Sequence, residues 1–455
     1  MSRRYKTPIG KAYPDIKVIE PKVSRWLIPF LRPCGRIYLF VFCGIARIVS
    51  HGDKADKALF EAFRRALAGE SRLIIAFRHP NGGEPQLLSW FFLFKLRKIA
   101  ARVGVRFVRR PHAVTVYGYE VVRWGGWIAR FVMPNLGAMP IHHAKMDSQG
   151  MARIYKAISE GAYPLALAPE GQVSYTSDDI PRLEPGTIRI GFHAAERLEA
   201  KGVTCPVEVL PVTVHFRFGS WGRVNIEVLL KKIEKVCGLS GKNRKGLPFV
   251  ERLRQCRDYI LAVNEKRYQI EADESLSFDA RLGKVIDAAL GTAERMIGAR
   301  GEGDFFSRIY KVRQYYWDRI FLPGVDSLDG KSYLERNVMD LQAGEAWYIG
   351  RHQELIDFCW YFRVPLPVDD AAFHTKIEYV QNLWDFASRT MGGAYPDRVN
   401  IFPRKVIVQA APVINLSERL PSYHSDKKAA IAAAMADLEK AYRDSISEMN
   451  RVEKG

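Results

Sequence analysis

The stretch Arg72-Leu-Ile-Ile-Ala-Phe77, followed by Arg78-His79-Pro80-Asn81-Gly82-Gly83-Glu84, decides the fold of this chain. A short apolar run of this kind is typical of a buried parallel strand. The Pro and Gly residues that follow it indicate a sharp loop, and we expect a helix to begin near residues 84–86. The sequence therefore predicts a strand, a loop and a helix, with an imidazole at the carboxyl end of the strand.

Strands and helices are expected to alternate on both sides of this stretch. Strand-like runs lie at 105–108, 138–141, 164–168 and 207–216, and helical patterns lie at 55–67, 124–132, 151–160 and 187–200. Such alternation predicts an α/β domain with a largely parallel central sheet flanked by helices.

The C-terminal half of the chain has a different pattern. Residues 224–230 are expected to form a further strand, and 235–247, rich in Gly, Ser and Lys, mark a boundary. Helical periodicity then continues to about residue 395, before the strand-like run 405–410 and one more helix. We therefore divide the chain into an N-terminal arm (1–25), an α/β domain (26–235), a mainly helical region or insertion (246–400), and a segment (401–455) that packs back on the α/β domain.

The charge balance narrows the class of partner. The chain has a formal net charge of +19, with a pI near 9.6, which favours a polyanion. Zinc-finger spacing, an RNP-like aromatic block and a basic zipper are all absent from the sequence, so we expect an anionic membrane surface and no nucleic acid. The six cysteines are scattered, which is typical of reduced thiols.

The segment 26–49 is the expected membrane contact. Its apolar residues are interrupted by Pro29, Arg32, Pro33 and Arg36, which suits one or two short helices lying in a membrane interface. The apolar run 87–94 is a second candidate. Neither is long enough to cross a bilayer, so we expect a peripheral or monotopic protein. A helical hairpin packed in the core is the alternative for residues 26–49.

His79 and Glu84 are the candidate catalytic residues. The sequence has no GxSxG, GxxxxGK[ST] or HExxH motif and no GxGxxG after a strand, so the usual hydrolase, nucleotide and zinc-protease interpretations do not apply. A carboxylate five residues after a histidine can reach back to one ring nitrogen and leave the other free as a general base. The alternative is a loop histidine beside a glutamate that only caps the next helix.

Four segments, in order, resemble the four blocks of the glycerolipid (lysophosphatidate-type) acyltransferases. The segment 78–84 resembles the family's H-x4-D block, with Glu84 in place of the Asp, and 137–143 (GAMPIHH) resembles the second block, G-x-x-F-I-x-R. The segments 168–174 (APEGQVS) and 209–212 (VLPV) resemble the third block, F-P-E-G-T-R-S, and the fourth, an apolar strand with a proline. The resemblance covers residues 30–220.

The resemblance implies a function and a set of site residues. His79 would be the general base and Glu84 its orienting carboxylate. Substrate contacts would come from the second, third and fourth blocks, namely Gly137, His143, Glu170, Gly171, Gln172 and Pro211. The donor would be acyl-CoA or acyl-carrier protein, the acceptor a lipid at the cytoplasmic face of a membrane, with no metal and no other cofactor.

The departures from the family pattern concern the acceptor. His143 and Val173 stand where the family has arginines that hold a phosphate, so we expect an acceptor without a free phosphate monoester beside its reacting group. Lys145 or Arg189 could compensate. An acyl-thioester hydrolase and a non-catalytic basic membrane-binding protein remain alternatives.

Overall fold

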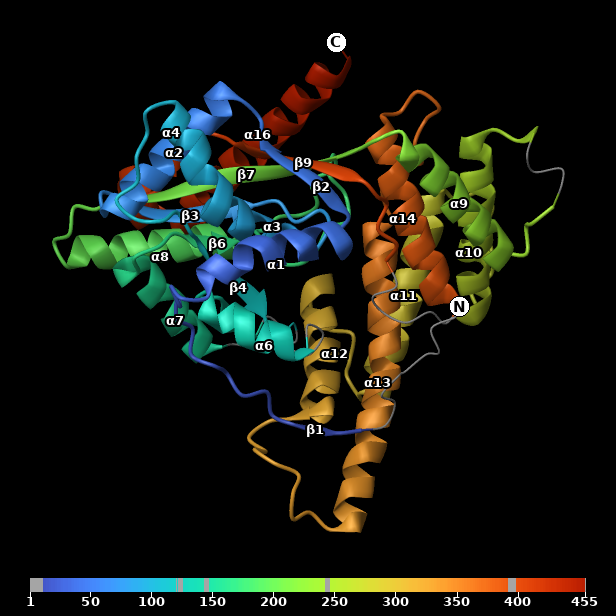
Figure 1. Ribbon diagram of the computed structural model, residues 1–455. Helices are drawn as coiled ribbons and strands as arrows, with labels where there is room; N and C mark the ends of the chain where they lie inside the picture. Colours follow the sequence, from blue (N-terminus) through green and yellow to red (C-terminus); the bar gives the residue numbers. More distant parts are fainter. Residues whose placement is uncertain are drawn as a thin grey trace. The chain divides into compact units, whose positions relative to one another are not determined.

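The structure, a computed structural model, describes residues 11–119, 121, 126–142, 147–241, 246–391 and 398–454 (Figure 1). The chain divides into two compact units. The α/β unit comprises Ile19–His142, Asp147–Trp221 and residues 402–454, and the helical unit comprises residues 11–18 and Gly222–Ile401. Segments that precede and follow the helical unit in the sequence therefore form the α/β unit together. The boundary between the α/β unit and the helical unit falls after residue 221, whereas the sequence predicted it at residue 235.

The α/β unit alternates strands and helices. Its strands are β2 (Ile45–Ser50), β3 (Arg72–Phe77), β4 (Val114–Gly118), β5 (Met139–Ile141), β6 (Leu165–Leu167), β7 (Val207–Phe218), β9 (Arg404–Ala410) and β10 (Ile414–Asn415). Its helices are α1 (Ile28–Val41), α2 (Asp53–Ala68), α3 (Glu84–Phe91), a π-helical turn (Phe92–Leu96) that leads into α4 (Arg97–Arg102), α6 (Gly126–Asn135), α7 (Ser148–Glu160), α8 (Gly186–Ala200), a 3₁₀ turn (Ser417–Arg419), α15 (Leu420–Ser425) and α16 (Lys427–Lys454).

The strands form one mostly parallel sheet in the order β2-β9-β7-β3-β6-β4-β5, with β10 paired to β7. Strands β3 to β7 are mutually parallel, β9 runs antiparallel to β7, and β2 runs parallel to β9. The α/β class with a largely parallel central sheet is therefore confirmed. Strand β9 comes from the end of the chain and lies inside the sheet, between β2 and β7.

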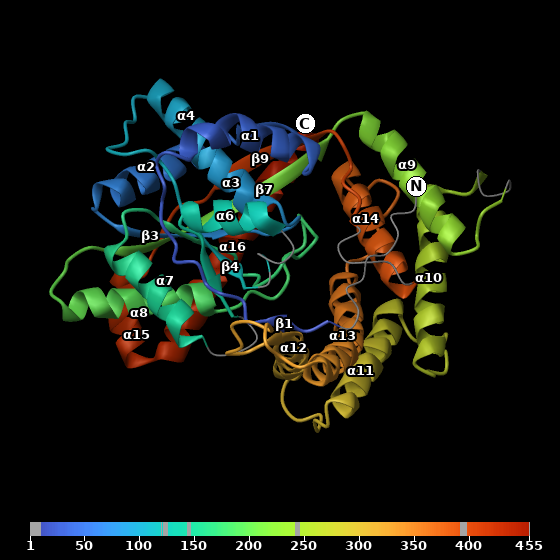
Figure 2. The same ribbon diagram turned by 60° about the horizontal axis from the view of Figure 1, so that its bottom comes forward.

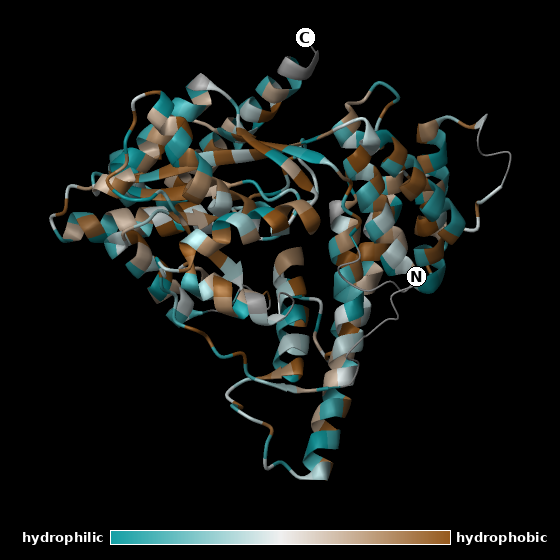
Figure 3. Cartoon of the chain, viewed as in Figure 1, coloured by the Kyte–Doolittle hydropathy of each residue, from teal (hydrophilic) through white to brown (hydrophobic). Residues whose placement is uncertain are grey.

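Helix α1 packs against α3 (Figure 2) and contains many hydrophobic residues (Figure 3). The two helices approach closely at Gly35, where an added Cβ would lie 3.1 Å from Trp90 Cδ1. Trp26, Phe30 and Phe42 are at least 60% exposed. The segment 26–49 thus contains one helix, in agreement with the one or two expected, and ends in strand β2, whereas the alternative of a helical hairpin is wrong.

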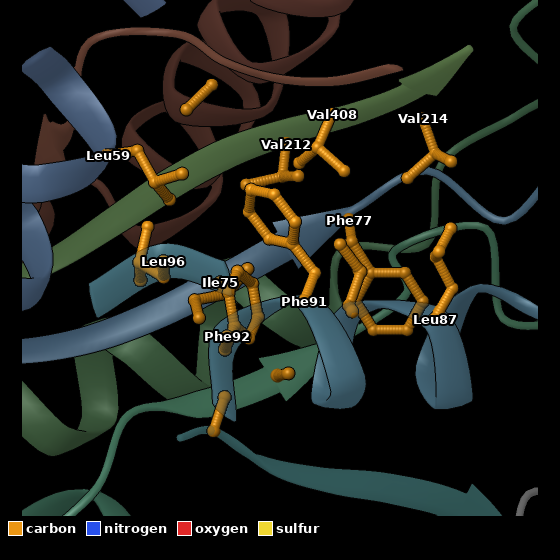
Figure 4. Close-up of a cluster of buried hydrophobic side chains, with 14 of the residues drawn as sticks. Leu59, Ile75, Phe77, Leu87, Phe91, Phe92, Leu96, Val212, Val214 and Val408 are labelled. Atoms are coloured by element: carbon orange, nitrogen blue, oxygen red, sulfur yellow. The ribbon is translucent and has the colours of Figure 1, made fainter. Parts of the chain in front are cut away.

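Two hydrophobic clusters cover the two faces of the sheet. One joins α2 and α3 to the sheet through residues such as Phe91, Phe92 and Val212 (Figure 4), and the other joins the sheet to α7, α8 and α16. Leu87, Leu88 and Leu96 are also buried in the first cluster. Residues 87–96 therefore belong mainly to the core, and the prediction that they contact a membrane is wrong.

Two predicted strands are also wrong. Residues 105–108 have no strand structure, and the strand of this region is β4, which follows His112. Residues 224–230 lie within helix α9 (Trp221–Val236), because Ile226, Leu229, Leu230 and Ile233 repeat at the helical spacing and are all buried.

The helical unit consists mainly of long helices. They are α9, α10 (Phe249–Arg267), α11 (Phe278–Met296), α12 (Phe305–Ile320), α13 (Tyr333–Tyr361) and α14 (Phe373–Thr390), with a two-residue ladder between β1 (Tyr13–Pro14) and β8 (Phe321–Leu322). Buried ion pairs join neighbouring helices, among them Arg252–Glu234 and Arg308–Glu294.

Candidate active site

The first and third sequence blocks meet at one edge of the sheet. Strands β3 and β6 are parallel neighbours, in register from Ile74 opposite Leu165 to Ala76 opposite Leu167. His79 follows the carboxyl end of β3 by two residues, and Glu170 follows that of β6 by three. Ligand sites of open α/β sheets lie at this edge, outside the carboxyl ends of the strands.

The His79 and Glu84 side chains are in direct contact. His79 Nδ1 lies 2.7 Å from Glu84 Oε2, and the same oxygen accepts a hydrogen bond from the Gly82 amide at 2.8 Å. Glu84 is the first residue of α3 and is fully buried, so the helix N-terminus stabilises its charge. Glu84 is thus both a first-turn carboxylate and a partner of His79.

The other ring nitrogen of His79 is available for chemistry. Within the described part of the chain, Nε2 makes no hydrogen bond, and the side chain is 15% exposed. With Nδ1 held by Glu84, the remaining nitrogen has the geometry of a general base that is oriented by a carboxylate.

Glu170 contacts the two residues that follow β3, through the side chain of Arg78 and the main chain of His79. One of its carboxylate oxygens accepts hydrogen bonds from Arg78 Nε and, at 3.2 Å, from the His79 amide. Its side chain is 1% exposed. The resemblance implied that Glu170 shapes the acceptor site, whereas its contacts in the structure hold His79.

Arg78 is a site residue that sequence reasoning missed. Its guanidinium is buried, forms an ion pair with Glu170, and donates to the carbonyls of Thr176 (3.0 Å), Ser177 (3.3 Å) and Asp179 (2.8 Å). The signal in the sequence was the position of Arg78 directly after a buried strand, because a buried guanidinium needs hydrogen-bond acceptors around it.

The loop after β6 also holds the carbonyl of His79. The Ser174 amide donates to His79 O at 2.9 Å. Gly171 turns the loop with φ of 70°, a conformation that favours glycine, and it is exposed. Gln172 is half-buried. Both peptide groups of His79 are therefore fixed by residues 170–174.

Val173 lies beside the glycine-rich loop that carries His79. An added Cβ at Gly82 would lie 3.6 Å from Val173 Cγ2. An apolar residue thus lies next to the His79–Glu84 pair, at the position where the acyltransferase pattern would have an arginine.

The second block is only partly described. His143 and Lys145 lie outside the described residues. Gly137 has φ of 75°, and an added Cβ would come within 2.7 Å of Val114 Cγ1 and 3.0 Å of Val23 Cγ2. Gly137 therefore allows the chain to pack closely against Val114 and Val23, where a larger residue would clash.

Pro211 lies in the central strand β7, opposite Ala76 of β3. Proline has no backbone N–H to donate to a neighbouring strand. Pro211 lies at the point of β7 where the pairing partner on one side changes from β9 to β10. Its carbonyl still accepts from the Ala411 amide at 3.0 Å. These contacts of Pro211 are those of the sheet.

Cys43, in the turn before β2, and Arg404 of β9 support the loop that carries His79, and sequence reasoning missed both. An added Cβ at Gly83 would lie 3.5 Å from Cys43 Sγ, and Arg404 Nε donates to Cys43 O at 2.9 Å. Burial raises the pKa of the Cys43 thiol and the Glu84 charge raises it further, although Arg404 opposes the rise. Cys43 is therefore a neutral packing residue beside Glu84.

Comparison of the chain with protein-family models, curated proteins and solved structures finds no match. No helix in the described part of the chain is long and apolar enough to cross a membrane. Among the described residues, no group of three or more His, Cys, Asp or Glu side chains is placed to hold a metal ion.

Proposed function

We propose that the protein is an acyltransferase that moves a fatty acyl chain from an acyl thioester to a hydroxyl or amine of a lipid at the cytoplasmic face of a membrane. The observation that carries the proposal is the 2.7 Å contact between His79 Nδ1 and Glu84 Oε2, which leaves Nε2 without a hydrogen bond among the described residues. The order of the four sequence blocks supports the same activity.

The reaction needs one residue to hold and return a proton. His79 Nε2 takes the proton of the acceptor hydroxyl or amine as the acceptor oxygen or nitrogen forms a bond to the thioester carbon. Glu84 stabilises the imidazolium, and its burial beside the ring strengthens that interaction. The carbon–sulfur bond then breaks, and the proton passes from His79 to the departing thiolate.

The surface around α1 supports a membrane as the partner. Residues 21–52 contain Lys22, Arg25, Arg32, Arg36 and Arg47 and no Asp or Glu. Exposed aromatic residues of this segment lie next to α6, because the rings of Trp26, just before α1, and Phe131 of α6 are 6.2 Å apart. Aromatic and basic side chains on one surface are typical of proteins that bind an anionic membrane peripherally.

The decisive experiment is incubation of the full-length protein with labelled acyl-CoA or acyl-carrier protein and a total membrane lipid extract. We expect one lipid class to gain the label, and His79→Ala to lower this transfer by about 10²–10⁴-fold without loss of folding. Thioester consumption without a labelled lipid would support a hydrolase instead. A variant that keeps more than a tenth of wild-type transfer would overturn the assignment of His79.

A further inference from the structure

Strand β2 is bordered by cationic side chains. It pairs with β9 and is the first strand in the order of the sheet. Arg36 Nη1 and Nη2 donate to Ile45 O (2.8 Å) and Ala46 O (2.6 Å), and Lys95 Nζ donates to Ile48 O (2.6 Å). Since two residues of a strand span about 7 Å, these bonds hold a guanidinium and an ammonium close together along one strand.

Three more cations lie close to these two. Arg47 belongs to β2 itself, and its partner in the register of β9 is Lys405, on a neighbouring strand about 4.8 Å away. Arg102 follows Lys95 by two helical turns, or about 10 Å. Burial lowers the pKa of Lys95, and the charges of Arg47, Arg36 and Arg102 lower it further, which agrees with their positions near the Lys95 ammonium.

Acidic groups do not neutralise this cluster. None of Arg36, Arg47, Lys95 and Arg102 forms an ion pair with a described Asp or Glu. Residues 85–119, like residues 21–52, contain no acidic residue. Like charges directly opposite one another, such as Arg47 and Lys405, destabilise a sheet slightly, and an anion bound from outside would offset this cost.

Protection of an edge strand explains only part of the arrangement. A single lysine is enough to block pairing with another chain. Arg36 and Lys95 already occupy carbonyls of β2, whereas Arg47 and Arg102 are exposed, and no hydrogen bond to a described residue uses their guanidinium donors.

We infer that Arg36, Arg47, Lys95 and Arg102 form a binding site for a phosphate ester, separate from the His79–Glu84 pair. Guanidinium groups bind phosphate oxygens bidentately and keep their charge, and lysine adds a point charge. Lys95 lies eleven residues beyond Glu84, or about 16 Å along the helix. Two ligands supply the required group, namely the CoA moiety of an acyl donor and the headgroup of an anionic lipid beside the exposed side of α1.

The test measures binding by the full-length protein without turnover. One arm titrates CoA by calorimetry, and the other measures flotation with phosphatidylglycerol vesicles against phosphatidylcholine vesicles. The variant is Arg47→Gln with Arg102→Gln, which leaves the side chains that bond to β2 in place. The matched control is Lys440→Gln with Arg443→Gln, two exposed cations of α16 that are paired with Asp444 and Glu439.

We expect the double variant to weaken binding by about a hundredfold in at least one arm, since a hydrogen bond to a charged group contributes about tenfold or more. Loss of CoA binding identifies the donor as the source of the phosphate, and loss of vesicle binding identifies a lipid headgroup. Unchanged binding in both arms, or an equal loss in the control pair, would overturn the site.

His79→Ala separates this site from the proposed reaction, because it should retain binding in full while it abolishes transfer. If the cations served only to block strand pairing, the double variant would associate in sedimentation experiments while its ligand binding stayed unchanged. Such a result would also overturn the site.

Discussion

The helical unit and the β2 side of the α/β unit differ in how their cations are paired. In the helical unit, buried carboxylates are matched by arginines, as in the bonds of Glu294 to Arg308 Nε and Nη2, both at 2.7 Å. In the α/β unit, Arg36, Arg47, Lys95 and Arg102 have no acidic partner among the described residues. The cations beside β2 thus differ both from the paired arginines of the helical unit and from Arg78, which pairs with Glu170 within the α/β unit. We attribute this difference to the phosphate ester site proposed above.

The strongest test of this comparison uses two carboxylates, each in the first turn of a helix. Glu84 begins α3 and contacts His79, whereas Glu335 of α13 accepts from Ser332 in a capping box and pairs with the neighbouring Lys331. We expect Glu84→Gln to lower acyl transfer by about a hundredfold, because an amide does not stabilise the imidazolium. Glu84→Asp should retain partial activity, and Glu335→Gln should leave transfer unchanged.

The measurement is the initial rate of acyl transfer from labelled acyl-CoA for each variant of Glu84 and Glu335. Circular dichroism checks that each variant is folded. Equal transfer by the Gln and Glu forms at residue 84 would show that Glu84, like Glu335, only caps its helix.

The next test compares the removal of a paired and an unpaired charge. Glu294→Gln leaves Arg308 without its buried partner and should lower the free energy of unfolding by about 2 kcal/mol, with no effect on transfer. Arg47→Gln should change stability by less than about 0.5 kcal/mol, because the residue is exposed and unpaired. Urea unfolding of both variants gives the two values. A larger loss from Arg47→Gln than from Glu294→Gln would contradict the distinction between the units.

His215 of the α/β unit is buried, and within the described part of the chain its ring forms no ion pair with an acidic residue that would hold a positive charge. Burial, with a smaller effect of Arg217, lowers the pKa of His215 to about 3. The folded protein keeps this ring neutral where the unfolded chain binds a proton, so stability falls as the pH drops from about 6.5 toward 3. Between pH 7.5 and 5 this single group should account for about 2 kcal/mol of lost stability.

The measurement for His215 is denaturant unfolding at pH 7.5 and pH 5. The variant His215→Gln removes the titrating group, so its loss between these pH values should be smaller by the same amount. The exposed His424 provides the control, and His424→Gln should keep the wild-type pH dependence. Identical pH dependence of the wild type and His215→Gln would contradict the assignment.

The sequence predicted the sheet class and the contact between His79 and Glu84, because both depend on local patterns. The run 72–77 is apolar throughout, and five residues bring a helix-start carboxylate back to the preceding loop. The roles of Arg78, Cys43 and Arg404 were missed because they depend on tertiary contacts. Arg404, for example, reaches Cys43 from a strand 361 residues away along the chain. Strand β2 was taken for a helix because its apolar residues continue those of α1 without a break.

The last prediction concerns the acceptor and has the smallest expected effect. Val173 packs beside Gly82 of the catalytic loop, where the acyltransferase pattern has an arginine. A phosphomonoester carries nearly two charges and is held best by fixed guanidinium groups, so an apolar residue here disfavours lysophosphatidate. We expect the wild type at pH 7.5 to prefer acceptors without a free phosphate monoester, such as a lysophospholipid with a blocked head group. Val173→Arg should shift the ratio of initial rates toward lysophosphatidate by about tenfold, the effect of one charged hydrogen bond. Val173→Leu keeps the apolar contact and should leave the ratio unchanged. A strong wild-type preference for lysophosphatidate would sink the idea, because other cations would then hold the phosphate.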